Sequence, residues 1–239
     1  MLISFSVNKR LFSAALTGHL TGVPHLSRQK LDKDYLTGKL PAKGNLVNYS
    51  AAGELYSEYQ KCLQCLKENY QRDLEELFDA QLKLLGYAVS PYKMIYVFAD
   101  PFYEKGGYIL DMPKRKKWAV ISVASGKVNW SNLTHEIFHL LLRKCVNWEK
   151  LDLDSVKWPV SEPYIKASNK TKYEEYLVRT MSIILRSSSD NLELEKRIQW
   201  QVKSGFKLMP KFVKHYLSHS VRQSWLPISR NPNGSLMSR

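Results

Sequence analysis

Two histidines and a glutamate lie within an apolar stretch of the sequence, THEIFHLLL, at residues 134–142. His135 and His139 are four residues apart, and on a helix this spacing places both imidazoles on one face, one turn apart. Two nitrogens in that arrangement can bind one Zn²⁺ ion and leave room for a third protein ligand and a water molecule. Glu136 points to the side of the histidine pair, where it could act as general base toward that water. The stretch therefore predicts a zinc centre suited to hydrolysis.

Two core histidines that happen to lie one turn apart are the alternative interpretation, because chance HExxH matches are common across a proteome. The neighbouring residues are apolar, and no further charge interrupts the run. A buried helix without a metal would have to bury an unpaired carboxylate, which costs several kcal/mol. The apolar context therefore favours a metal-binding helix over a plain core helix.

The HExxH motif at residues 135–139 resembles the signature helix of the zincin metallopeptidases. The resemblance extends over about residues 94–189, and only the motif itself is specific. It implies Zn²⁺ as the cofactor and a peptide or protein as the substrate. It also implies a small sheet before the helix, whose edge strand pairs with the extended substrate. Residues 118–124 are the candidate edge strand, because they come just before the helix.

The third zinc ligand distinguishes the zincin subfamilies. Metzincins continue the motif with a glycine and a third histidine, where this chain has Leu142 and Cys145. Without the glycine the helix has no reason to turn, so Cys145 is expected in the core. Gluzincins take a glutamate from a later helix, and the segment YEEYLVRTM offers Glu174 and Glu175. The resemblance to gluzincins therefore implies one of these two glutamates.

Helical periodicity favours Glu174 as the third ligand. Apolar residues follow it at positions 177, 178, 181 and 185, which places Glu174 on the inward stripe of the helix. Glu175 shares its face with Arg179 and could lie on a solvent face. Against this preference, several gluzincin families have a small residue three positions after the ligand, and Val178 suits Glu175. We therefore predict Glu174 as the ligand beside the two histidines, with Glu175 as the alternative.

The sequence leaves two supporting roles open. Many gluzincins have an acidic residue four positions after the ligand glutamate, where it orients the first histidine, but this chain has Val178 or Arg179 there. The partner that orients the histidines must therefore come from elsewhere. The resemblance also implies an oxyanion-stabilising side chain near the zinc. The candidates are Tyr173, Tyr176, Arg179, His215 and Tyr216.

The elements that would position this site predict an α+β fold. A long amphipathic helix is expected over residues 51–85, with Gly86 at its end. Strand-like runs follow at 94–99, 106–112 and 118–125, and the basic turn between the last two favours a hairpin. The motif helix then begins after a cap at Asn129 or Ser131. A helical segment follows at 172–188, and residues 192–226 are expected to form one or two further helices, broken near Gly205 and Pro210. The expected fold is a small mixed or antiparallel sheet, an active-site helix and a mainly helical C-terminal part, similar to the zincins.

Composition divides the chain into three predicted parts. Residues 1–48 are expected to form an N-terminal segment and linker, because residues 21–46 are rich in turn-forming and basic residues. Residues 49–226 are expected to form a single zincin-like metallopeptidase domain, and residues 227–239 a flexible tail.

The start of the chain bears on localisation. It has no acidic residue before Asp32, which suits an organellar transit peptide, although a strand and a short helix explain it equally well. No apolar run approaches the roughly 20 residues of a membrane-spanning helix. We expect a cytoplasmic protein without a membrane span.

The chain contains three cysteines, which cannot all pair with one another and so argue against a secreted disulfide scaffold. Cys62 and Cys65 fall on the long predicted helix, and no second CxxC completes a zinc ribbon. We predict that these two side chains pack against other helices, with a redox or metal-binding role as the alternative.

The formal net charge of +14 attracts nucleic acid, acidic lipid surfaces or acidic protein substrates. Lysine and arginine concentrate in the last third of the chain, and aromatic residues are interleaved there as stacking surfaces would be, although helix core explains them too. These aromatic residues are Trp200, Phe206, Phe212, Tyr216 and Trp225. The alternative function is therefore a basic protein that binds nucleic acid or another partner, with a structural or inactive zincin-like helix.

Overall fold

The computed structural model describes residues 3–6, 8–20, 25–37, 49–102, 107–111, 117–122, 128–151, 153–154, 156–187 and 190–218. The chain forms two compact units, one of Met1–Phe78 with Tyr92–Ile137 and one of Asp79–Pro91 with Phe138–Arg239. Helix α4 (Trp130–Cys145) supplies its first half to one unit and its second half to the other. The predicted single domain over residues 49–226 stays a prediction.

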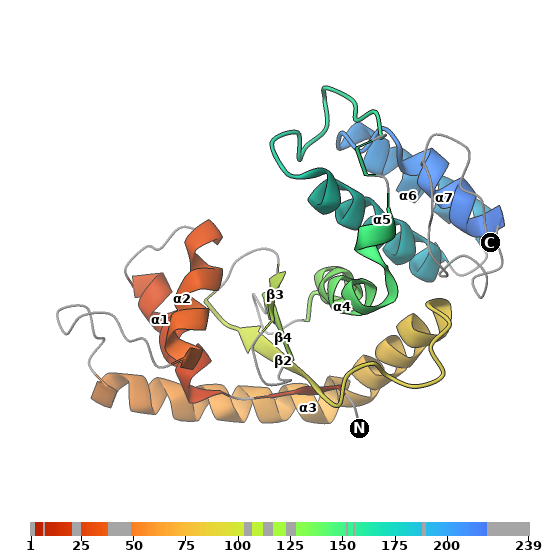
Figure 1. The fold of residues 1–239 in the computed structure, drawn as a ribbon. Helices are drawn as coiled ribbons and strands as arrows, with labels where there is room; N and C mark the ends of the chain where they lie inside the picture. The colour runs from red at the N-terminus through yellow and green to blue at the C-terminus, as the bar shows by residue number, and fades with distance from the viewer. Residues whose placement is uncertain are drawn as a thin grey trace. The chain divides into compact units, whose positions relative to one another are not determined.

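The first unit contains a mixed four-stranded sheet, in which β2, β4 and β3 are labelled in Figure 1. Its strands are β1 (Ile3–Phe5), β2 (Ile95–Asp100), β3 (Gly107–Asp111) and β4 (Lys117–Ser122), in the order β1-β2-β4-β3. β2 pairs in parallel with β1 and β4, and β3 and β4 form the predicted antiparallel hairpin. The α+β prediction and the three predicted strands are therefore confirmed.

The prediction of residues 118–124 as an edge strand is wrong. β4 is an inner strand, and β1 and β3 form the edges of the described sheet. β4 pairs with β2 on one side and turns the hairpin with β3 on its other side, so both of its backbone edges are used.

The prediction of residues 21–46 as a loop is also wrong over α2 (His25–Thr37), which lies beside α1 (Lys9–Leu20) in Figure 1. Tertiary contacts stabilise this helix. The Tyr35 and Thr17 hydroxyl groups lie 2.8 Å apart, and the Tyr108 hydroxyl donates a hydrogen bond of 2.5 Å to Asp32. Gln29 donates a hydrogen bond of 2.7 Å to the carbonyl of Ile109 on β3. Tertiary contacts of this kind routinely outweigh a weak helical pattern.

The long helix α3 (Tyr49–Leu84) matches the predicted one, and Gly86 follows it with φ of 73°, as expected at a helix stop. In the first unit α3 packs against the sheet and α1. The Tyr59 ring stacks on Phe12 with ring centroids 5.0 Å apart, and its hydroxyl donates to the carbonyl of Ala99. Cys62 and Cys65 are exposed on α3, so the prediction that they pack against other helices is wrong.

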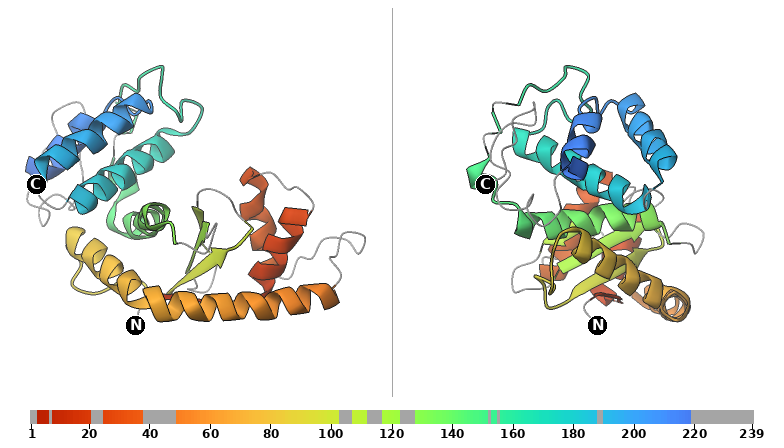
Figure 2. Two further views of the ribbon diagram at one scale, coloured as in Figure 1. Left: turned by 180° about the vertical axis from the view of Figure 1, so that it is seen from behind. Right: turned by 90° about the vertical axis from the view of Figure 1, so that its right-hand side faces the viewer.

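In the second unit α5 (Asn169–Ser187) packs against α6 (Asn191–Lys203) and α7 (Met209–Ser218), the teal and blue helices of Figure 2. A short 3₁₀ helix, Trp148–Lys150, follows α4. Aromatic rings fill the core, with Tyr176 4.8 Å from Phe212 and 5.5 Å from Phe206 between ring centroids. The predicted break occurs at Gly205, where φ is 103°, and it separates two helices, with Pro210 in the first turn of α7. The predicted tail at 227–239 lies outside the described residues.

None of the described helices is both long enough and apolar enough to cross a lipid bilayer.

Candidate metal centre

Helix α4 positions the HExxH motif. Its N-terminus is capped by Asn129, whose side chain accepts a hydrogen bond of 3.1 Å from the backbone N–H of Asn132, which confirms one of the two predicted caps. Leu133 and Ile137 are fully buried, so the helix is anchored by an apolar stripe through the motif. Glu136 and His139 are only 8 % and 9 % exposed. The motif therefore lies on a packed helix, with Glu136 and His139 largely removed from solvent and His135 half-buried.

Helix α5 carries the two candidate glutamates. Glu174 and Glu175 are 7 % and 9 % exposed, and every residue from 172 to 178 is buried. The interpretation that Glu175 faces solvent is therefore wrong. α5 is covered on more than one side, by α6 and α7 and by side chains of α4, so it has no simple solvent stripe at this level.

His135, His139 and Glu175 form a group that could hold a metal ion. Their ligand atoms all lie within 4.8 Å of one another. Nε2 of His139 lies 3.3 Å from Oε1 of Glu175. Two ligands of a tetrahedral zinc ion, each about 2.0–2.1 Å from the metal, are roughly 3.4 Å apart. The spacing of this imidazole and carboxylate therefore suits a shared metal ion.

Glu174 contacts the other nitrogen of the same ring. Its Oε1 lies 2.7 Å from Nδ1 of His139 and accepts a hydrogen bond of 2.9 Å from Nε of Arg143. These are hydrogen-bond distances, shorter than the spacing of two zinc ligands. The structure thus groups Glu175, the predicted alternative, with the histidines. Arg143 was not predicted, although its position one turn after His139 could have indicated it.

Each of the two buried glutamates, Glu174 and Glu175, lies beside an arginine. Burial would raise the pKa of Glu174, but the hydrogen bond from His139 and the nearby charge of Arg143 outweigh burial and lower the pKa. Glu175 pairs with Arg179, whose Nε lies 3.4 Å from Oε2 of the carboxylate. Arg179 is held in turn by stacking 3.9 Å from the ring centroid of Phe206. Each glutamate therefore has its own arginine.

The predicted oxyanion candidates differ in their surroundings. The Tyr176 hydroxyl donates a hydrogen bond to Glu162. Tyr173 and Tyr216 lie in the core, where burial raises the pKa of both tyrosines. The His215 ring packs against Tyr216 with ring centroids 5.1 Å apart. Arg179 contacts Glu175 of the group directly. Arg179 is thus a candidate whose contact with the group is described, and its role toward an oxyanion stays a prediction.

The aromatic residues of the C-terminal third mostly form core. Phe206, Phe212 and Tyr216 are buried, which agrees with the interpretation as helix core and removes them from a stacking surface. Trp200 is 62 % exposed on α6. Trp225 lies outside the described residues.

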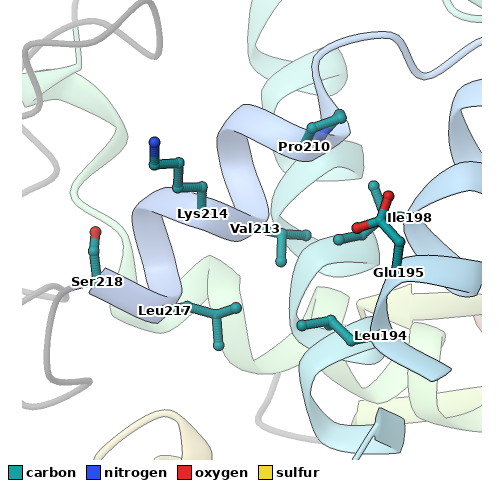
Figure 3. Close-up of a pocket in the computed structure, with 8 residues that line it drawn as sticks. All are labelled: Leu194, Glu195, Ile198, Pro210, Val213, Lys214, Leu217 and Ser218. Carbon is teal, nitrogen blue, oxygen red and sulfur yellow. The ribbon is translucent and has the colours of Figure 1, made fainter. Parts of the chain in front are cut away.

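A groove of about 450 Å³ lies between α6 and α7 (Figure 3). Its lining is mostly apolar, with Glu195 and Lys214 as its charged residues. The residues that line it are distinct from the histidines and glutamates described above. The groove is therefore a separate feature from the candidate metal centre.

Comparisons with known proteins add no family to this geometry. No model of a protein family matches the chain, and no curated protein or solved structure matches it significantly. The zincin resemblance therefore rests on the motif, and the functional argument rests on the site itself.

Proposed function

We propose that this chain is a zinc-dependent metallopeptidase in which His135, His139 and Glu175 bind one Zn²⁺ ion and Glu136 acts as general base. The observation that carries the proposal is the grouping of three ligand atoms from α4 and α5 within 4.8 Å of one another. Two imidazole nitrogens and one carboxylate oxygen are a donor set that binds zinc in hydrolytic enzymes, where a fourth position stays open. The α+β arrangement, with a small sheet before the motif helix, also supports a zincin-like enzyme.

Glu136 supplies the proton transfer that peptide hydrolysis needs. It directly follows His135, so its side chain leaves the helix about 100° round the axis from that imidazole. Its carboxylate would take a proton from the attacking water and deliver it to the leaving amine. When bound, zinc would lower the pKa of water and polarise the substrate carbonyl. In this proposal the metal ligand, Glu175, and the general base, Glu136, are therefore different carboxylates.

The substrate class follows from the reaction and the charge. A peptide or unfolded protein is proposed, and the net charge of +14 favours an acidic one. A cytoplasmic location remains part of the proposal, and so does the zincin fold.

The test begins with metal analysis of purified protein. Wild type and Glu136→Gln should each contain about one zinc per chain, and His139→Ala should contain almost none. Wild type should cleave an acidic unfolded protein, whereas Glu136→Gln should be slower by a factor of about 10²–10⁴. Wild type without stoichiometric metal would refute the zinc site. Full activity of Glu136→Gln would refute its role as base.

One observation favours the alternative function, a basic nucleic-acid-binding protein. Trp200 is exposed on α6, and Lys196 and Lys203 are exposed on the same helix face. An exposed aromatic ring between lysines suits stacking on single-stranded nucleic acid. Binding that weakens steeply with salt and is lost in Trp200→Ala would support this function. A fluorescence titration that detects no binding at low salt would remove it.

A further inference from the structure

Glu174 and Glu175 are neighbours in sequence but contact opposite nitrogens of one imidazole ring. Oε1 of Glu174 lies 2.7 Å from Nδ1 of His139, and Oε1 of Glu175 lies 3.3 Å from Nε2. In a neutral imidazole one nitrogen carries the proton and the other carries the lone pair. A carboxylate at hydrogen-bond distance from Nδ1 keeps the proton on that nitrogen. The lone pair of Nε2 then faces the side on which Glu175 lies.

Arg143 holds Glu174 in place. Its Nε donates a hydrogen bond of 2.9 Å to the same carboxylate oxygen that accepts from His139. Arg143 and His139 are one turn apart on α4, so Glu174 of α5 contacts two successive turns of the motif helix. To bind a metal through this oxygen, Glu174 would have to give up both hydrogen bonds. Glu175 needs no such change, because its Oε1 already lies beside Nε2.

We propose that Glu174 is a positioning residue which, held by Arg143, orients His139 and fixes its tautomer, while Glu175 is the metal ligand. This inference rests on the proposed metal site and adds the division of roles between the two glutamates. Carboxylates that accept from the outer nitrogen of a metal-binding imidazole typically change metal affinity by a factor of about 10–100 when removed. Removal of a direct ligand has a larger effect and also changes the coordination of the ion.

The experiment compares Zn²⁺ affinity by competition with a chromophoric chelator at one fixed pH. Glu174→Ala should still bind about one zinc per chain, with affinity reduced by a factor of about 10–100. Glu174→Gln should recover part of this loss, because its amide oxygen can still accept from Nδ1. Arg143→Ala should weaken binding in the same direction and by less. Glu175→Ala should lose stoichiometric binding.

Two further measurements support the comparison. The visible spectrum of bound Co²⁺, used in place of zinc, should keep its shape in Glu174→Ala and change in any Glu175→Ala that still binds cobalt, because the spectrum reports the ligand set. Glu193→Ala is the matched control, since it breaks another Glu–Arg pair, with Arg197 at 2.6 Å on α6, and should leave zinc affinity unchanged. Circular dichroism of the metal-free variants checks that each is folded.

The possible results separate an error in the roles of the two glutamates from an error in the proposed metal site. If Glu174→Ala loses the metal and Glu175→Ala keeps it, the roles are reversed and this inference is wrong, although the proposed function stands. Equal and complete loss in both variants would mean that both glutamates are ligands, which also contradicts it. Wild type that binds no metal would refute the proposed function and this inference together, and that result is visible without any variant.

Discussion

The hydroxyl group of Tyr176 donates a hydrogen bond of 2.7 Å to Oε2 of Glu162, and both side chains are buried. The same hydroxyl accepts a hydrogen bond of 3.2 Å from the backbone N–H of Leu208. These two bonds connect α5 with the loop before it and with the turn before α7. The contact therefore helps to fix the helix that carries both candidate glutamates.

Tyr176→Phe should lower the free energy of unfolding by about 1–3 kcal/mol, because it leaves a buried carboxylate oxygen and a backbone N–H without their partner. Urea unfolding followed by circular dichroism would measure the change. Tyr70→Phe is a suitable control: the Tyr70 hydroxyl makes no hydrogen bond with the residues that the structure describes, so its loss should change stability by less than about 0.5 kcal/mol. Equal effects of the two substitutions would contradict the structural role of Tyr176.

Glu162 should make stability depend on pH. Burial raises the pKa of Glu162, although the hydrogen bond from Tyr176 and the charges of Lys172 and Arg179 act to lower it. A carboxyl group whose pKa is higher in the folded than in the unfolded chain binds more protons when folded, so stability falls as pH rises through that interval. Glu162→Gln removes this titration and keeps an oxygen that can accept from Tyr176.

The free energy of unfolding of Glu162→Gln relative to wild type should therefore rise with pH. The difference should begin to grow near the ordinary glutamate pKa of about 4.3 and level off above the raised pKa. Urea unfolding of both proteins at several pH values would measure it. A difference that shrinks as pH rises from acid to neutral would contradict the sign.

Local signals in the sequence predicted the elements that carry the site. The cap at Asn129 and the apolar stripe through Leu133 and Ile137 are contained within α4 itself, so α4 could be predicted without knowing its neighbours. Helix α2 could not be predicted in this way, because it is stabilised in part by hydrogen bonds from residues distant in sequence, such as that from Tyr108 to Asp32. Its sequence alone is that of a basic, turn-rich segment.

For a related reason, the sequence could not show which of the two glutamates the structure groups with the histidines. Periodicity assumes a helix with one buried face, whereas α5 is buried continuously from residue 172 to 178. Which carboxylate reaches which nitrogen of His139 depends on the packing of α5 against α4, which the sequence of either helix does not contain. The same packing of α5 against α4 brings Arg143 within hydrogen-bond distance of Glu174.

Two glycines should respond oppositely to the same substitution. Gly205 has φ of 103°, and a Cβ atom there would lie 2.8 Å from Cγ of Pro163, so Gly205→Ala should destabilise the chain by about 1–3 kcal/mol. Gly53 lies in α3 with nothing within 4 Å of its Cβ position, so Gly53→Ala should stabilise by about 0.5–1 kcal/mol. Thermal unfolding of both variants tests the pair. Stabilisation by Gly205→Ala would contradict the described turn.

Zinc should stabilise the folded chain through the histidine pair. A ligand that binds only the folded state, at a free concentration 100 times its dissociation constant, adds about 2.7 kcal/mol to the free energy of unfolding. Wild type should therefore unfold at higher urea concentration with Zn²⁺ than with a chelator. His139→Ala should show no such shift, whatever its own stability, because it lacks the imidazole between the two glutamates. His215→Ala, which changes a half-buried histidine on α7, should keep the full shift. An equal zinc-induced shift in His139→Ala would place the stabilising ion elsewhere in the chain.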